Sequence, residues 1–259
     1  MVVMILPKVL EDARILENVK VGPGIFRMLV ESPRVAGEAL PGQFVQLRLL
    51  SGDFLLRRPL GIAERSSDLE GFSLFYRVVG RGTETLSHLA AGETVNLLGP
   101  LGNGFSRNYS HPLLVGGGLG LSPLLSVAEY YGDRAEVLMG GKTAGELFWR
   151  DFYKPFTEQI HITTDDGSLG EKGFTTALLP KLLEKGSYDG ILVCGPEIMM
   201  RGVAEIAERH GIPCEVSLEK RMACGLGACL SCVIDTADGK RKKVCKDGPV
   251  FPAQEVFFS

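Results

Sequence analysis

Residues 112–132 read PLLVGGGLGLSPLLSVAEYYG, and this stretch decides the class of fold. Residues 112–117 form a continuous apolar run, which is typical of a strand buried in a parallel sheet. Residues 122–131 place apolar side chains at helical spacing, and Gly132 ends that pattern. A strand, a glycine-rich turn and a helix in direct succession predict one unit of an α/β domain.

The same alternation continues toward the C-terminus. Strands are expected within residues 135–141, 159–167, 188–196 and 214–219, and helices within 146–156, 176–186 and 197–211. Strands that alternate with helices of this length predict a parallel sheet.

The first hundred residues show a different pattern, of short strands separated by turns. Residues 24–32, 42–50 and 72–80 are rich in β-forming side chains, and a helical pattern over 82–92 interrupts them. This spacing predicts a small antiparallel β-barrel. We therefore expect an α+β multidomain chain: a barrel over 1–108, an α/β parallel-sheet domain over 109–213 and a small C-terminal domain over 214–259.

Composition and charge narrow the possible partners. The 259 residues are 45% hydrophobic and 23% charged, with a net charge of −3, which gives no reason to expect nucleic acid as a partner. Residues 1–16 lack the features of a signal peptide, and the longest apolar stretch, 112–128, is broken by four glycines and a proline, so no membrane association is expected. The expected location is the cytoplasm, where clustered cysteines bind metal or do redox work more often than they form disulfides.

Four cysteines of the C-terminal domain have the spacing C-x4-C-x2-C-x12-C. They are Cys224, Cys229, Cys232 and Cys245. This is the spacing of a plant-type [2Fe–2S] site. The intervening Gly225, Gly227 and Ala228 allow the loop to wrap closely, with its N–H groups toward the sulfurs. Structural zinc is the alternative, although zinc ribbons pair two short knuckles, whereas here three cysteines share one loop.

The remaining two cysteines have different settings. Cys214 opens an expected strand, which favours a place in the core. Cys194 ends a strand at the expected ligand side of the sheet, where core packing and a cofactor contact both remain open.

The glycine-rich turn suits a nucleotide. Side chains are absent at Gly116, Gly117, Gly118 and Gly120, and the following helix directs its dipole at an anion. Tight packing of strand against helix is the alternative. A second strand end, Cys194–Gly195–Pro196, favours a nucleotide because ligands bind beyond the carboxyl ends of such strands.

An acidic turn follows a neighbouring strand. Asp165 or Asp166 is placed to accept hydrogen bonds from a ribose and to repel a 2′-phosphate, which favours NAD over NADP. An ordinary turn of Asp and Gly residues is the alternative.

Two motifs of the barrel also fit phosphate. Two arginines precede Pro59 at a strand end, where a guanidinium can clamp a diphosphate. Gly80, Gly82 and Thr83 precede the helical stretch, which is another helix N-terminus able to face phosphate. Each motif is common when it stands alone.

The order of these motifs resembles the ferredoxin–NAD(P)H reductase family. The motifs are RRPLG (57–61), GRGTETL (80–86), LLVGGGLGLSPLL (113–125) and VCGPEIMM (193–200). With CGLGACLSCVIDTADGKRKKVCKDGPVF (224–251), the chain is similar over its whole length to one branch, the electron transfer subunits of type B dihydroorotate dehydrogenase. In the family, the barrel binds a flavin and the α/β domain binds the nicotinamide nucleotide.

The resemblance implies sites and partners. It places FAD on Arg58, Pro59, Leu60, Gly61, Phe75, Tyr76, Arg77, Gly82 and Thr83, and the [2Fe–2S] cluster on the four cysteines. It implies an FMN-containing catalytic subunit that oxidises dihydroorotate to orotate in pyrimidine biosynthesis, with two copies of each chain in a heterotetramer. Electrons are then expected to pass from FMN through the cluster and FAD to NAD⁺, without a catalytic acid or base in this chain.

One residue departs from the family pattern, and other interpretations stay open. Members usually carry serine or threonine where this chain has Gly61. A reductase subunit of another complex, of the sulfide dehydrogenase or ferredoxin oxidoreductase type, is one alternative, and a binding module with structural zinc is another. The basic run 240–243 is either a surface that steers an acidic partner or a solvated hairpin.

Overall fold

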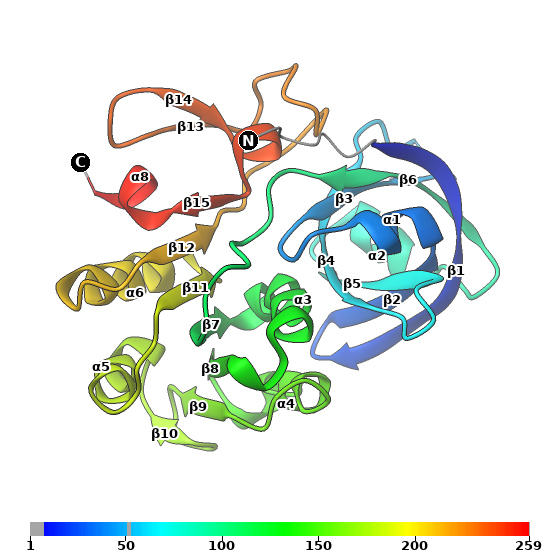
Figure 1. The fold of residues 1–259 in the computed structure, drawn as a ribbon. Coiled ribbons are helices and arrows are strands. Elements are labelled where there is room, and N and C mark those ends of the chain that lie inside the picture. Colours follow the sequence, from blue (N-terminus) through cyan, green and yellow to red (C-terminus); the bar gives the residue numbers. More distant parts are fainter. Residues whose placement is uncertain (1–7, 51–52, 259) are drawn as a thin grey trace.

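The computed structural model describes residues 8–50 and 53–258. Residues 1–7, which carry part of the stretch searched for a signal peptide, lie outside the described residues. Figure 1 shows a barrel on one side, a sheet with its helices on the other, and a small C-terminal unit above the sheet.

The N-terminal part is a closed barrel of antiparallel strands in the order β1-β2-β5-β4-β3-β6, as expected. Its strands are β1 (Val9–Gly22), β2 (Ile25–Glu31), β3 (Phe44–Leu49), β4 (Arg58–Arg65), β5 (Gly71–Arg77) and β6 (Thr94–Leu101). Two short helices, α1 (Pro33–Glu38) and α2 (Arg81–Ser87), connect them. Buried aliphatic and aromatic side chains such as Leu47, Phe72 and Tyr76 fill the barrel interior.

Sequence pattern alone did not predict β1, β4 and β6. β1 carries charged side chains, among them Arg14, which pairs with Glu31 of β2. β4 contains Pro59 and Gly61, two residue types that are rare in strands. Pairing with neighbouring strands outweighs these weak local preferences.

The second part is a seven-stranded sheet in the order β10-β9-β8-β7-β11-β12-β15. Its strands are β7 (Pro112–Gly117), β8 (Glu136–Gly141), β9 (Ile160–Thr164), β10 (Glu171–Lys172), β11 (Gly190–Cys194), β12 (Cys214–Ser217) and β15 (Val250–Pro252). Only β15 runs antiparallel to its neighbour, so the expected parallel sheet is confirmed.

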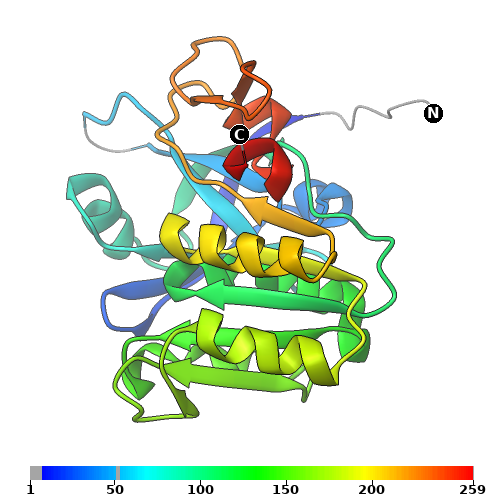
Figure 2. The ribbon, with the colours of Figure 1, turned by 90° about the vertical axis from the view of Figure 1, so that its left-hand side faces the viewer.

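Helices cover both faces of this sheet. They are α3 (Leu121–Tyr131), α4 (Trp149–Tyr153), α5 (Thr175–Lys185) and α6 (Glu197–Arg209), with 3₁₀ turns at Gly118–Gly120, Gly132–Arg134 and Ala144–Glu146. Figure 2 shows α5 and α6 lying across one face, and α3 packs on the opposite face, toward the barrel. α4 is shorter than the expected helix over 146–156, because a 3₁₀ turn occupies Ala144–Glu146 before it and Pro155, which lacks an N–H, lies just beyond its end.

The C-terminal unit is tied to the sheet by strand pairing. It contains the hairpin β13 (Val233–Asp235) and β14 (Arg241–Lys243), and the helices α7 (Val244–Asp247) and α8 (Ala253–Phe257). β12 and β15 both lie beyond the expected boundary near 213, yet they pair within the seven-stranded sheet. Val216 and Phe251 face each other across this pair and are buried, so the unit shares the core of its neighbour.

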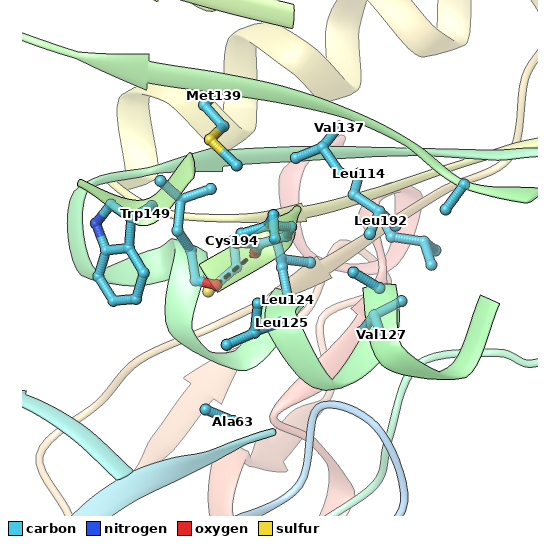
Figure 3. Close-up of a cluster of buried hydrophobic side chains, with 14 of the residues drawn as sticks. Ala63, Leu114, Leu124, Leu125, Val127, Val137, Met139, Trp149, Leu192 and Cys194 are labelled. Atoms are coloured by element: carbon cyan, nitrogen blue, oxygen red, sulfur yellow. Dashed lines mark hydrogen bonds between the residues drawn. The ribbon is translucent and has the colours of Figure 1, made fainter. Parts of the chain in front are cut away.

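The barrel and the sheet also share one hydrophobic core. Ala63 of β4 and Phe75 of β5 pack with Leu124 and Leu125 of α3, and Figure 3 shows Ala63 facing the helix from below. An ion pair of 2.9 Å between Arg65 and Glu129 spans the same boundary. Within residues 8–50 and 53–258, no helix is long and apolar enough to cross a bilayer.

Candidate functional site

A cavity of about 860 Å³ lies where the barrel, the sheet and the C-terminal unit meet. This volume is in the upper range of ligand pockets and suits a large cofactor. Eleven of the expected cofactor residues line it: Arg58, Pro59, Leu60, Tyr76, Arg77, Thr83, Gly117, Gly118, Gly120, Gly195 and Pro196. Motifs that are far apart in the sequence therefore converge on one site.

A smaller cavity of about 200 Å³ adjoins the first and shares Pro59 and Leu60 with it. Three more expected residues line this inner cavity: Gly61, Phe75 and Cys194. Cys194 is 2% exposed, and burial raises the pKa of its thiol far above the usual value. Cys194 therefore belongs to the hydrophobic core and also lines the inner cavity, and its contact with a cofactor stays a prediction.

Three expected residues do not line either cavity. A Cβ on Gly116 would lie 2.4 Å from the Leu121 side chain, so this glycine serves packing between β7 and α3. Gly82 leaves room for the guanidinium of Arg58, which lies directly over it. Asp165 is exposed, and the neighbouring Asp166 accepts hydrogen bonds from the backbone and hydroxyl of Ser168, as in an ordinary acidic turn.

The two glycine loops pack against each other at the ends of β7 and β11. A Cβ on Gly120 would lie 2.4 Å from the carbonyl oxygen of Cys194, and one on Gly195 would lie 2.6 Å from Met199 Cε. Gly118 has a φ of +58°, which favours glycine, and has open space around its missing side chain. The loops thus present bare backbone to the large cavity.

The barrel side of the cavity is positively charged and supported by aromatic rings. Arg58 lies 4.7 Å from the ring centroid of Phe54, which holds the guanidinium near the start of α2. Thr83 stabilises that start, because its hydroxyl accepts hydrogen bonds from the N–H groups of Val79 and Gly80. Tyr76 packs in the barrel core, where its hydroxyl donates to Asn18 Oδ1 over 2.8 Å, and it also lines the large cavity.

Sequence reasoning missed the residues that close the cavities from the C-terminal side. Leu218, Glu219 and Lys220, which follow β12, line both cavities, and Val256 and Phe257 of α8 line the larger one. Burial raises the pKa of the Glu219 carboxyl. Nothing in the local sequence marks these residues as part of the site.

The four motif cysteines lie together beside the barrel. Cys232 and Cys245 are each 2% exposed and pack with Phe44 of β3, while Cys229 is at the surface. The thiol of Cys224 meets that of Cys229, and the thiol of Cys245 meets that of Cys232 and lies near Cys224. Two thiolates on each of two irons is the ligand set of a [2Fe–2S] cluster, so the residues fit this group.

Backbone N–H groups point at these sulfurs. Leu226 donates to Cys224 Sγ over 3.3 Å, and Gly227 donates to Cys245 Sγ over 3.2 Å. Burial opposes ionisation of Cys224, but hydrogen bonds from the N–H groups of Leu226, Ala228 and Cys229 and from the Cys229 thiol outweigh it and lower the pKa of Cys224 to about 6. Burial and the neighbouring Cys232 raise the pKa of Cys245 to about 12.

A single-ion site is not formed by the described part of the chain. Among those residues, no group of three or more His, Cys, Asp and Glu side chains converges closely enough to hold one metal ion.

Two further expectations concern surface and core residues. Cys214 begins β12 and packs partly buried against the core on the helix α6 side. In the basic run 240–243, Lys240, Arg241 and Lys242 form ion pairs with Asp238, Asp235 and Glu255. This arrangement supports a solvated, internally paired hairpin.

Known proteins resemble the chain over nearly its full length. Residues 219–257 match the sequence model of the iron–sulfur cluster binding domain of dihydroorotate dehydrogenase B. The electron transfer subunit of dihydroorotate dehydrogenase B (NAD(+)) from Clostridium acetobutylicum is 37% identical over 249 residues, which cover 95% of this chain and 96% of that protein. The subunit of the same name from Listeria monocytogenes is 36% identical over 255 residues, with coverage of 95% and 98%.

Solved structures agree on the fold. A chain of an NADH-dependent reduced ferredoxin–NADP oxidoreductase superposes with a TM-score of 0.85 at 34% identity, covering 94% of this chain and 89% of that one. A ferredoxin NADP+ reductase from Neisseria gonorrhoeae, with 16% identity, has a TM-score of 0.64 over 78% of this chain and 92% of that one.

Proposed function

The chain belongs to the family of dihydroorotate dehydrogenase B electron transfer subunits, and from this premise we propose that it carries electrons between an FMN-containing catalytic subunit and NAD⁺. A [2Fe–2S] cluster and FAD are its resident cofactors, and the dihydroorotate site belongs to the partner. The observation that carries the proposal is the large cavity, which is bounded jointly by the barrel, both glycine loops and the segment that leads to the cysteines.

The order of carriers follows from their chemistry. A nicotinamide exchanges two electrons as hydride, an iron–sulfur cluster exchanges one electron, and a flavin does both, so the flavin belongs between them. The cavities match this order, since the inner cavity reaches Met222, two residues before Cys224, and the larger one reaches the glycine loops.

The proposal assigns FAD to the barrel wall. Arg58 neutralises the diphosphate, with Gly82 leaving space for its guanidinium. Pro59, Leu60 and Gly61 form the wall beside the ring system, together with Phe75, Tyr76, Arg77 and Thr83. Gly61 contributes backbone where related chains contribute a hydroxyl, so backbone N–H groups or water satisfy the flavin at this point.

The nicotinamide nucleotide is assigned to the sheet side of the same cavity. Gly117, Gly118 and Gly120 leave the backbone of the first loop open to its pyrophosphate, and Gly195 and Pro196 do so at the second loop. Cys194 is buried at the wall of the inner cavity, and the surrounding protein, which partly removes the Glu219 carboxyl from water, raises its pKa, so it keeps its proton more readily than a fully solvated glutamate. Asp165 lies outside both cavities, so the proposal gives it no contact with the pyrophosphate or the nicotinamide. Its proposed role is limited to a hydrogen bond with the ribose that is farther from the nicotinamide.

The assembly and location complete the proposal. Two copies of each chain form a heterotetramer that works in pyrimidine biosynthesis in the cytoplasm. All six cysteines lie within the described residues and none of them forms a disulfide, which supports a reducing compartment. Native mass measurement of the purified complex tests the two-plus-two composition.

The decisive experiment is purification of this chain together with its catalytic subunit. The complex is expected to contain FAD, FMN and iron, to lose flavin and cluster absorbance when NADH is added, and to oxidise NADH in the presence of orotate. A colourless protein containing zinc and no iron refutes the electron transfer role. A coloured complex that reduces ferredoxin but not orotate instead supports a reductase like the NADH-dependent ferredoxin–NADP oxidoreductase, whose chain is 34% identical.

A further inference from the structure

Gln46 is a buried polar residue that the barrel itself does not satisfy. It lies on β3, its exposed fraction is 0%, and within the described residues neither its amide nitrogen nor its amide oxygen has a hydrogen bond partner. Burial of an amide without a partner is destabilising, so such groups in native proteins usually meet a ligand, a water or another polar group. The question is what Gln46 faces.

The side chain of Gln46 faces the cysteine loop. A Cβ on Gly225 would lie 2.7 Å from Gln46 Cγ and 3.0 Å from Gln46 Nε2. Gly225 directly follows Cys224 and has a φ of +70°, so the loop turns sharply at the point where the amide reaches it. A side chain at position 225 would displace Gln46 from the loop.

The neighbouring residue on the same face of β3 supports this placement. Side chains at i and i+2 of a strand point to the same side, so Phe44 and Gln46 face together. Phe44 packs in one cluster with Cys232 and Cys245. The face of β3 that carries Gln46 is therefore the surface on which the cysteines rest.

The strand next to Gln46 lines the cavities. Strand pairing sets Gln46 opposite Pro59 of β4, and Pro59 lines both cavities. Gln46 thus stands in the part of the barrel wall that separates the cavities from the cysteines.

We propose that Nε2 of Gln46 donates a hydrogen bond to a sulfur of the [2Fe–2S] cluster at Cys224 and thereby raises the reduction potential of the cluster. The inference rests on the proposed function, because it requires a cluster on the four cysteines. Hydrogen bonds to the sulfurs stabilise the negative charge that reduction adds, which is one of the ways a protein sets such potentials. The loop supplies backbone donors from Leu226 and Gly227, and Gln46 adds a side-chain donor from the barrel.

The first test detects the bond directly in the purified complex. The side-chain amide of glutamine is labelled with ¹⁵N, the cluster is reduced, and pulsed electron paramagnetic resonance measures nuclear couplings. A ¹⁵N coupling is expected in the wild-type complex and is expected to vanish in Gln46→Leu. Absence of this coupling in the wild type overturns the inference, even where the variant fails to fold.

Gln43 provides a matched control. It is also a buried barrel glutamine, 7% exposed, but its amide is used within the barrel: Nε2 donates to Gly102 O over 2.7 Å and Oε1 accepts from Leu40 N over 2.8 Å. Gln43→Leu is therefore expected to lower the melting temperature and to leave the ¹⁵N coupling in place.

The second test is a redox titration of the cluster in the same complexes. Loss of one donor is expected to reduce the equilibrium constant for one-electron reduction of the cluster about tenfold in Gln46→Leu, which corresponds to about 59 mV toward more negative potential. Gln43→Leu is expected to keep the wild-type potential. An unchanged potential in Gln46→Leu, or an equal shift in both variants, overturns the inference while leaving the proposed function intact. A wild-type complex without iron or a cluster signal refutes the proposed function itself.

Discussion

Replacement of Gly120 by alanine tests whether the two glycine loops form one unit. Gly120 precedes α3, and a Cβ there would lie 2.4 Å from Cys194 O and 2.5 Å from Gly195 N. Ordinary contact for a Cβ begins at 3.4 Å, so the strand ends must separate by about 1 Å. Both obstructing groups are backbone, which cannot move aside as a flexible side chain does.

The magnitude follows from overpacking. Inserting a methyl group into a close-packed site costs about 1–3 kcal/mol, and we expect the upper half of this range because the backbone must shift. Alanine recovers about 0.4–1 kcal/mol through the unfolded chain, since the φ of Gly120 is −62° and suits any residue. The net loss of about 1–2 kcal/mol corresponds to a melting temperature lower by roughly 2–8 °C for a chain of this size.

The effect on function is expected to exceed the effect on stability. Both loops line the large cavity, and displacement of a bound reactant by about 1 Å slows a reaction by on the order of 100-fold. Stopped-flow measurement of flavin reduction by NADH, together with thermal unfolding, checks both numbers. Gly37→Ala is the control, because Gly37 lies in α1 with nothing within 4 Å of its missing Cβ. The rate of flavin reduction should stay at the wild-type level, and the melting temperature should stay the same or rise slightly, since alanine favours a helix over glycine. Wild-type flavin reduction and stability in Gly120→Ala would show that the loops are not coupled through this contact.

Three further substitutions test other parts of the molecule. Gly61→Ser introduces the hydroxyl that the family resemblance leads one to expect at this position, but its Cβ would lie 3.3 Å from Pro123 Cβ. Thermal unfolding should therefore reveal a loss of up to about 1 kcal/mol, and a clear gain would contradict the tight fit. Glu136→Gln should make the free energy of unfolding less dependent on pH in the acid range. Burial raises the pKa of the Glu136 carboxyl, but hydrogen bonds from His161 and Tyr188 and the positive charge of the nearby histidines outweigh burial and lower the pKa overall. The stabilisation by the carboxylate is therefore complete above its unfolded pKa and is lost as the pH falls through the lower folded pKa. Denaturant unfolding between about pH 3 and 7 measures this, and parallel profiles for both proteins would disprove it. Cys245→Ser should lose iron by metal analysis while FAD is retained, whereas Cys214→Ser should keep both; iron at wild-type content in the first variant rules out that ligand.

Periodicity in the sequence predicted the sheet well because its strands are buried on both faces. β7 and β11 are continuous apolar runs, and such strands need no partner information to be recognised. β1 is half polar and exposed along much of its length, so its place in the barrel depends on pairing with β2 and β6. Local pattern carries little information about such a strand.

Residues of the candidate site could be predicted where the backbone conformation or the bound group admits only particular residue types. The glycines at 118 and 195 and the spaced cysteines are such residues. Leu218 and Phe257 are not, since apolar side chains that line a cavity resemble those of any core. Gln46 was equally invisible, because its role depends on which loop comes to rest on β3.

The length of chain between the cavities and the cysteines explains why a separate ferredoxin-like domain is unnecessary. Ser217 lines the inner cavity, and Cys224 lies seven positions further along the chain, so even a fully extended connection spans at most about 25 Å. The structure shortens this further, because Met222 also lines the inner cavity and lies only two residues before Cys224, a span of at most about 7 Å. β15 then returns the chain to the sheet and pairs with β12, which prevents the cysteine unit from swinging away. The short connecting chain and the β12–β15 pairing thus fix the distance between the proposed FAD and cluster positions. No movement of a tethered domain is needed to bring the two cofactors together.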